Sequence, residues 1–213
     1  IIADENTLYD IEKYPVISLT WTPARYPVLD EHIYIQQHLV WSVEVTYEIN
    51  DMFETDMNSF DNYLGVHLRY GKDWQRSCRN GIERGHPYMS SKQCINQELF
   101  PKDNSITSQI CYPEVDEILN DIELLLKQTG ASIIYLASDE LDKVYDIIET
   151  RFPNVPIIYR IDNYHRAQVD LGMLIKGQHF IGNCLSSFTN FVVRSRTLEG
   201  KENHFFGLIS NSN

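Results

Sequence analysis

The chain has 213 residues, of which 43% are apolar and 23% are charged. This composition is ordinary for a globular domain and excludes wholesale disorder. The 30 acidic and 18 basic residues give a net charge of −12, which argues against binding duplex DNA or RNA through a basic face. No apolar run approaches the roughly 18–20 residues of a membrane span. The chain starts at Ile1 without Met or a signal-type segment, so we expect a trimmed or excised piece of a longer protein.

The first 42 residues lack clean periodicity and contain three aromatic-proline steps, at 14–15, 21–23 and 26–27. Each proline restricts the residue before it to extended geometry, which predicts irregular wrapping such as a connection between two lobes. Residues 30–58 are helix-like. The residues expected on one face of that helix are Ile33, Gln37, Val40 and Trp41.

Residues 63–70 (YLGVHLRY) predict a buried strand that ends at Gly71. Side chains alternate along a strand, so Leu64, Val66 and Leu68 should lie on one face, and Gly65, His67 and Arg69 on the other. Residues 72–112 then lack strong periodicity. A region of that length is uncommon in a compact domain unless it is functional or tied down, and three cysteines inside it supply a tie.

The second half of the chain alternates helix and strand. Periodicity and capping predict helices over 113–130, from Ser138 or Asp139 to Phe152, over 165–176 and over 186–196. Strands are predicted over 132–138, 155–161 and 179–183. This order indicates an α/β fold, a Rossmann-like doubly wound parallel sheet. Ligands bind at the carboxyl ends of such strands, which here are 69–71, 138–139 and 182–187.

The four cysteines are Cys78, Cys94, Cys111 and Cys184. Their spacing does not match a zinc site, and no D-x-D motif follows a strand end, so no metal site is expected. An even number of cysteines in polar segments favours two disulfides and an oxidising, secretory compartment. The alternative is four free thiols in a cytosolic protein.

Three groups of residues could bind a ligand. The segment 182–191 leads from a strand into a helix that starts at Ser186 and Ser187, which suits a phosphate or diphosphate. The alternative is an ordinary serine cap. His67 and Arg69 share one strand face, and arginine matches phosphate oxygens. The alternative is a structural ion pair of Arg69 and a packed histidine.

Asp170 lies between apolar neighbours on a predicted helix and must find hydrogen-bond donors. The N1 and N2 positions of guanine would supply two. The alternative is an ion pair with Arg166, one turn earlier on the same helix.

Two long stretches carry a resemblance to a known family: VHLRYGKDWQRSC (66–78) and HFIGNCLSSFTNFVVRSR (179–196). Further matching segments are AQVDLGMLIKGQ (167–178), YPVLDEHIYIQQHLVWS (26–42) and HFFG (204–207). Together they resemble the protein O-fucosyltransferases that modify EGF-like repeats.

The resemblance implies a two-lobed glycosyltransferase of the GT-B type. Residues 1–213 would form its carboxyl-terminal, donor-nucleotide-binding lobe, with 1–42 as the inter-lobe connection and 72–112 as a disulfide-tied loop. The family's amino-terminal lobe carries a G-R-F-G-N-type loop, which this chain lacks. The resemblance also implies the disulfides Cys78–Cys111 and Cys94–Cys184, and residence in the endoplasmic reticulum lumen.

The activity implied is inverting transfer of fucose from GDP-β-L-fucose to a Ser or Thr hydroxyl of a folded EGF-like repeat, as in Notch-type receptors. No cofactor or metal would be needed. Arg69 would be catalytic by holding the β-phosphate, and Asp170 would bind guanine. The other residues that the resemblance places at the donor are His67, Ser186, Ser187 and Phe188. Alternatives are a catalytically silent module that binds a nucleotide sugar or EGF repeats, and a related fucosyltransferase acting on thrombospondin-type repeats or glycans.

Overall fold

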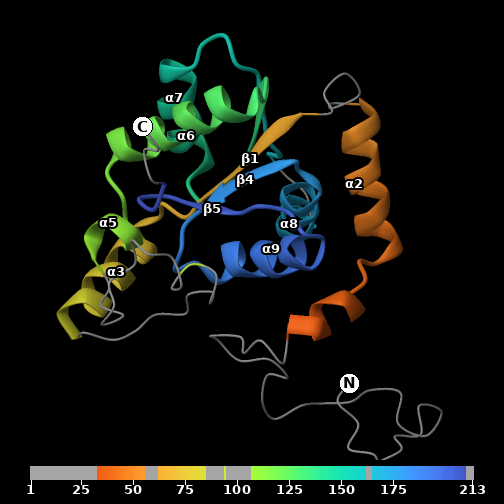
Figure 1. The fold of residues 1–213 in the computed structure, drawn as a ribbon, viewed down its shortest axis with the longest axis horizontal. Helices are drawn as coiled ribbons and strands as arrows, with labels where there is room; N and C mark the ends of the chain where they lie inside the picture. The colour runs from red at the N-terminus through yellow and green to blue at the C-terminus, as the bar shows by residue number, and fades with distance from the viewer. Residues whose placement is uncertain (1–32, 56–61, 85–93, 95–106, 162–164, 210–213) are drawn as a thin grey trace, which may run out of the picture.

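A computed structural model describes residues 33–55, 62–84, 94, 107–161 and 165–209. Most of the expected inter-lobe connection, including its proline steps, lies outside the described residues. Figure 1 shows the described part as a central sheet with helices on both faces.

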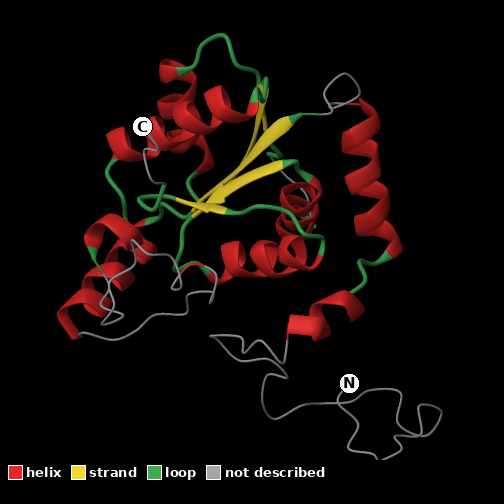
Figure 2. Ribbon diagram, viewed as in Figure 1, coloured by secondary structure: helices red, strands yellow, loops and turns green. Residues whose placement is uncertain are grey.

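The sheet has five strands in the order β3-β2-β1-β4-β5. Figure 2 shows them side by side between the helices. All four strand pairs are parallel. The strands are β1 (Tyr63–Leu68), β2 (Ile133–Ser138), β3 (Ile157–Ile158), β4 (His179–Gly182) and β5 (His204–Phe205). This is the strand order of a doubly wound sheet, so the predicted fold class is confirmed.

The two faces of the sheet carry separate apolar clusters. One cluster packs α2 (Val43–Thr55), α8 (Arg166–Lys176) and α9 (Ser187–Leu198) on the sheet, and the other packs α6 (Val115–Thr129) and α7 (Leu141–Arg151). Leu64, Val66 and Leu68 lie in the second cluster, whereas Tyr63 lies in the first. The predicted alternation along β1 is therefore confirmed.

The single helix predicted over 30–58 is wrong. A short 3-10 helix, η1 (Tyr34–His38), is separated from α2 by residues 39–42. Val40, expected on the buried face, is 88% exposed. The reason is that Gln36 turns inward, where its Nε2 donates to Ser195 Oγ at 2.8 Å and its Oε1 accepts from Arg194 Nε at 3.2 Å. These bonds fix η1 on α9 independently of α2.

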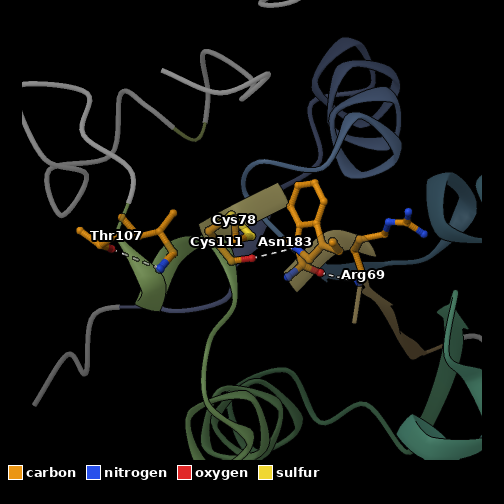
Figure 3. Close-up of a disulfide and its surroundings, with 7 residues drawn as sticks. Arg69, Cys78, Thr107, Cys111 and Asn183 are labelled. Atoms are coloured by element: carbon orange, nitrogen blue, oxygen red, sulfur yellow. Dashed lines mark hydrogen bonds between the residues drawn. A yellow bond between two sulfur atoms is a disulfide. The ribbon is translucent and has the colours of Figure 1, made fainter. Parts of the chain in front are cut away.

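The region 72–112 contains helices that periodicity did not reveal. They are α3 (Lys72–Arg84) and the short α5 (Ser108–Cys111). The buried residues of α3 include Trp74, Cys78 and Gly81, which follow helical spacing but offer only one large apolar side chain. Trp74 Nε1 donates to the Cys111 carbonyl at 2.9 Å, and the Cys78–Cys111 disulfide joins the two helices (Figure 3).

Two strands also differ from the prediction. The strand expected over 155–161 is reduced to the two residues of β3, and β5 was not predicted. No helix within the described residues is long and apolar enough to cross a membrane.

Candidate functional site

A cavity of about 460 Å³ opens at the carboxyl ends of the strands. Its wall includes all six residues singled out from the sequence: His67, Arg69, Asp170, Ser186, Ser187 and Phe188. They come from the end of β1, from α8 and from the start of α9, so segments more than 100 positions apart meet here. Asp139, after β2, and Arg166, the first residue of α8, line the same cavity.

His67 is a buried residue of the cavity wall. It is 5% exposed, its Nδ1 lies 2.7 Å from Thr189 Oγ1, and its ring stacks on Phe188 at 4.5 Å between centroids. Burial, with a smaller contribution from the charge of Arg69, lowers the pKa of His67 to about 3. The imidazole is therefore neutral at physiological pH and can offer the cavity a flat ring and a hydrogen bond, but no charge.

A close approach of backbone and helix makes this arrangement possible. A Cβ on Gly182, the last residue of β4, would lie 2.6 Å from Thr189 Oγ1 and 2.9 Å from Phe180 Cζ. The missing side chain lets α9 pack directly on β4, which brings Thr189 to His67.

Arg69, also in the cavity wall, makes two ion pairs. Its Nη1 donates to Asp139 Oδ2 at 2.7 Å and its Nη2 donates to Asp73 Oδ2 at 2.5 Å. The backbone N–H of Arg69 donates to Asn183 Oδ1 at 2.6 Å (Figure 3). The structural ion pair considered as an alternative is thus present. It leaves three of the five guanidinium N–H groups without a partner among the described residues, so Arg69 can also bind a ligand in the cavity.

Asp139 organises the turn that carries Arg69. Its carboxylate accepts the backbone N–H groups of Tyr70 at 2.7 Å and Gly71 at 2.9 Å, in addition to the Arg69 guanidinium. It does not cap α7, whose N-cap is Glu140 without a side-chain cap bond, so the expected cap at Ser138 or Asp139 is wrong. Sequence reasoning did not assign Asp139 to the site, although its position after β2 was a signal.

Asp170 is a buried carboxylate facing the cavity. It is 5% exposed, and its Oδ1 accepts the Tyr135 hydroxyl at 2.7 Å. Its Oδ2 lies 3.7 Å from Arg166 Nε, so the ion pair considered as an alternative is present but long. Burial raises the pKa of Asp170 to about 6, against the opposing effects of the Tyr135 bond and the Arg166 and Arg160 charges. The Tyr135 contact could not be read from sequence, because Tyr135 lies in the middle of β2.

Ser186 and Ser187 begin α9 at the cavity wall. Ser186 occupies the N-cap position but makes no side-chain cap bond, so the ordinary serine cap is not what the structure contains. The first-turn N–H groups of a helix attract anions, and two hydroxyls beside them add donors. The part of the cavity wall formed by Ser186 and Ser187 therefore suits a phosphate or diphosphate.

The structure contains two disulfides, Cys78–Cys111 and Cys94–Cys184. This is the pairing that the family resemblance implies. Cys184 is fully buried and stands two residues before Ser186, so the second disulfide holds the turn between β4 and α9. Within the described residues no group of three or more His, Cys, Asp or Glu side chains could hold a metal ion.

Known proteins show the same sequence pattern and fold. A family model described as GDP-fucose protein O-fucosyltransferase matches residues 4–199. GDP-fucose protein O-fucosyltransferase 1 from Caenorhabditis elegans is 29% identical over 206 residues, which are 92% of this chain and 50% of that protein.

Two crystal structures of POFUT1 extend the comparison. The complex with GDP-fucose (crystal form I) has a TM-score of 0.74 and 26% identity, covering 94% of this chain and 56% of that chain. The apo form (crystal form I) has a TM-score of 0.73 and 27% identity, covering 93% and 56%. The chain thus spans about half the length of these relatives. The similarity agrees with the expected Rossmann-like lobe of the GT-B type, and the chain belongs to the GDP-fucose protein O-fucosyltransferase family.

Proposed function

We propose that this chain forms the GDP-fucose-binding lobe of an inverting glycosyltransferase, which moves fucose from GDP-β-L-fucose to a Ser or Thr hydroxyl of a folded EGF-like repeat. Notch-type receptors would carry such repeats, and the endoplasmic reticulum lumen would be the compartment. One observation carries the proposal: the six residues that the family resemblance selects line a single cavity of about 460 Å³.

The lining of that cavity combines the two kinds of group that a nucleoside diphosphate requires. The Asp170 carboxylate would offer acceptors to the N1 and N2 hydrogens of guanine. The start of α9, with Ser186 and Ser187, would offer donors to the diphosphate. His67 and the stacked Phe188 form the wall beside them.

Arg69 would act on the leaving group. During transfer the bond between fucose C1 and the β-phosphate oxygen breaks, a bond from C1 to the acceptor oxygen forms, and the electron pair stays on GDP. Negative charge therefore grows on the β-phosphate. A fixed guanidinium at that oxygen stabilises the charge as it develops, which lowers the barrier. The contacts to Asp139 and Asp73 hold Arg69 in place before the reaction.

The hydroxyl proton of the acceptor is not assigned to a base in this chain. Asp139 accepts three hydrogen bonds, and Asp170 is buried against Tyr135 and Arg166. Both carboxylates therefore position neighbouring groups of the site. If the bond to GDP breaks early and C1 becomes oxocarbenium-like, the reaction demands less of a base. No cofactor enters this scheme.

A second candidate function retains the donor site without the reaction. The chain spans about half of its relatives, and Arg69 already pairs with two carboxylates of this chain. A catalytically silent module that binds a nucleotide sugar would share the cavity and its affinity for GDP.

Calorimetry with GDP, UDP and GDP-fucose tests the donor site directly, with Arg69→Ala measured in parallel. We expect selective binding of GDP and GDP-fucose over UDP, weakened in the variant. Absence of GDP binding by the folded chain would contradict the proposal. Transfer to an isolated EGF-like repeat, assayed in a two-lobed protein that carries this chain, then separates the enzyme from the silent module.

A further inference from the structure

Arg166 is a second cation in the cavity wall, in addition to Arg69. Its side chain is 32% exposed and lines the cavity one helical turn before Asp170. The Nη2 group donates to the Ser138 carbonyl at 2.9 Å, and Nε lies 3.7 Å from Asp170 Oδ2. Among the described residues, its Nη1 group has no hydrogen-bond partner.

These contacts place a donor and an acceptor side by side. The Ser138 carbonyl accepts a hydrogen bond from the Arg166 guanidinium, and the Asp170 carboxylate lies within ion-pair distance of it. The nearby Arg160 is not equivalent, because it pairs with Glu48 at 2.6 Å and does not line the cavity. Arg69 is held by Asp139 and Asp73.

The edge of a guanine ring has the complementary pattern. O6 is an acceptor, and the neighbouring N1 and N2 carry hydrogens that are donated. O6 is attached to the carbon next to N1, so the protein groups that bind O6 and N1 must themselves be neighbours. In protein–DNA complexes, arginine or lysine donating to guanine O6 and N7 is the commonest specific contact.

We infer that Arg166 is a specificity-determining residue, whose guanidinium donates to guanine O6 while Asp170 accepts from N1 and N2. The inference rests on the proposed function. Adenine would present its amino group to Arg166, so two donors would meet. Uracil would present a carbonyl oxygen to Asp170, so two acceptors would meet. Arg166 therefore disfavours adenine, and Asp170 disfavours uracil.

The test is a matrix of three diphosphates and four proteins, measured by calorimetry at pH 8 so that Asp170 is ionised. GDP is compared with 6-thio-GDP, in which sulfur weakens the acceptor at position 6, and with IDP, which lacks the N2 amino group. The proteins are the wild-type chain, Arg166→Leu, Arg166→Gln and Asp170→Asn. Thermal melts establish that each variant is folded.

Wild type should bind GDP roughly 10–100-fold more tightly than 6-thio-GDP, the range for a hydrogen bond to a charged group. Arg166→Leu should bring GDP and 6-thio-GDP within a few-fold of each other and keep the preference for GDP over IDP. Arg166→Gln retains an N–H donor and should restore part of the preference for oxygen. Asp170→Asn should lose mainly the preference for GDP over IDP.

Two results would overturn the inference, and they are distinguishable. If Arg166→Leu weakens all three diphosphates by the same factor, Arg166 contacts the ribose or diphosphate and does not determine base specificity. If the wild-type chain binds no GDP, the proposed function fails, and the inference fails with it.

Discussion

Asp139 and Arg69 are 70 positions apart in the chain and are joined by a 2.7 Å hydrogen bond across the ends of two neighbouring strands. The parallel register aligns Leu68 with Ser138, so the residues that follow each strand come together. The same Asp139 carboxylate binds the N–H groups of Tyr70 and Gly71. One side chain thus sets both the turn after β1 and the direction of Arg69.

Asp139 and Asp73 form a matched pair of variants. Both contact Arg69 but, within the part of the chain that the structure describes, only the Asp139 side chain accepts backbone N–H groups. Asp139→Asn should lower the free energy of unfolding by about 1–3 kcal/mol, since an amide has one acceptor oxygen for three donors. The Asp73 side chain is 69% exposed, so Asp73→Asn should change the free energy of unfolding by no more than about 1 kcal/mol. Urea unfolding measures both, and equal losses would contradict the role given to Asp139.

Arg69→Ala should reduce turnover by roughly 10²–10³-fold, by analogy with the loss of one oxyanion donor. The reason is that the charge on departing GDP loses its fixed cation. Initial rates are measured in a two-lobed protein that carries this chain, with Arg69→Lys alongside. Lysine keeps the charge without the planar fork and should retain part of the rate. Near-normal turnover of Arg69→Ala would remove Arg69 from the mechanism.

Asp170→Asn should raise the stability of the chain at neutral pH while it weakens the binding of GDP. Burial raises the pKa of Asp170 from 3.8 to about 6, so the ionised carboxylate opposes folding above that pH. As the pH falls from about 7 to 4 the carboxyl is protonated in the folded state before the unfolded state, and this cost disappears. The variant should therefore melt a few degrees higher than wild type at pH 7, with the difference vanishing near pH 4.

The same variant should bind GDP more weakly, because a neutral amide replaces a charged acceptor. Wild-type affinity for GDP should itself fall below about pH 6, where Asp170 becomes protonated. The exposed Asp142 supplies the control, since Asp142→Asn should leave both melting and affinity unchanged. A variant that melts lower than wild type at pH 7 would show that the carboxylate stabilises the apo fold.

Removal of the Cys94–Cys184 disulfide should weaken GDP binding as well as stability. The disulfide holds the turn that leads into Ser186, and the loss of a native disulfide typically costs about 2–5 kcal/mol. The double variant Cys94→Ser with Cys184→Ser is compared with Cys78→Ser with Cys111→Ser. The second pair should lose stability but keep its affinity for GDP. If both double variants fold and bind GDP with the same affinity, the Cys94–Cys184 disulfide has no specific role in the nucleotide site.

The elements predicted well are those whose apolar residues repeat at a regular interval. The helix predicted over 113–130 is α6, where Ile118, Ile122 and Leu125 are buried and Gly130 ends the helix in a left-handed conformation (φ 67°). α3 escaped prediction because a disulfide and the Trp74 hydrogen bond anchor it in place of an apolar stripe. The break at 39–42 depends on the contacts of Gln36 with α9, which are remote in sequence.

The sequence alone was enough to predict the alternation of helix and strand in the second half of the chain and to select the six candidate residues. Those predictions depend on local periodicity, on the chemistry of individual side chains and on the resemblance to a known family. Only the tertiary structure decided that β1 lies between β2 and β4, because backbone hydrogen bonds join strands without regard to side-chain identity. That order brings Asp139 to Arg69, Tyr135 to Asp170 and Thr189 to His67. The burial that it creates raises the pKa of Asp170 and lowers that of His67.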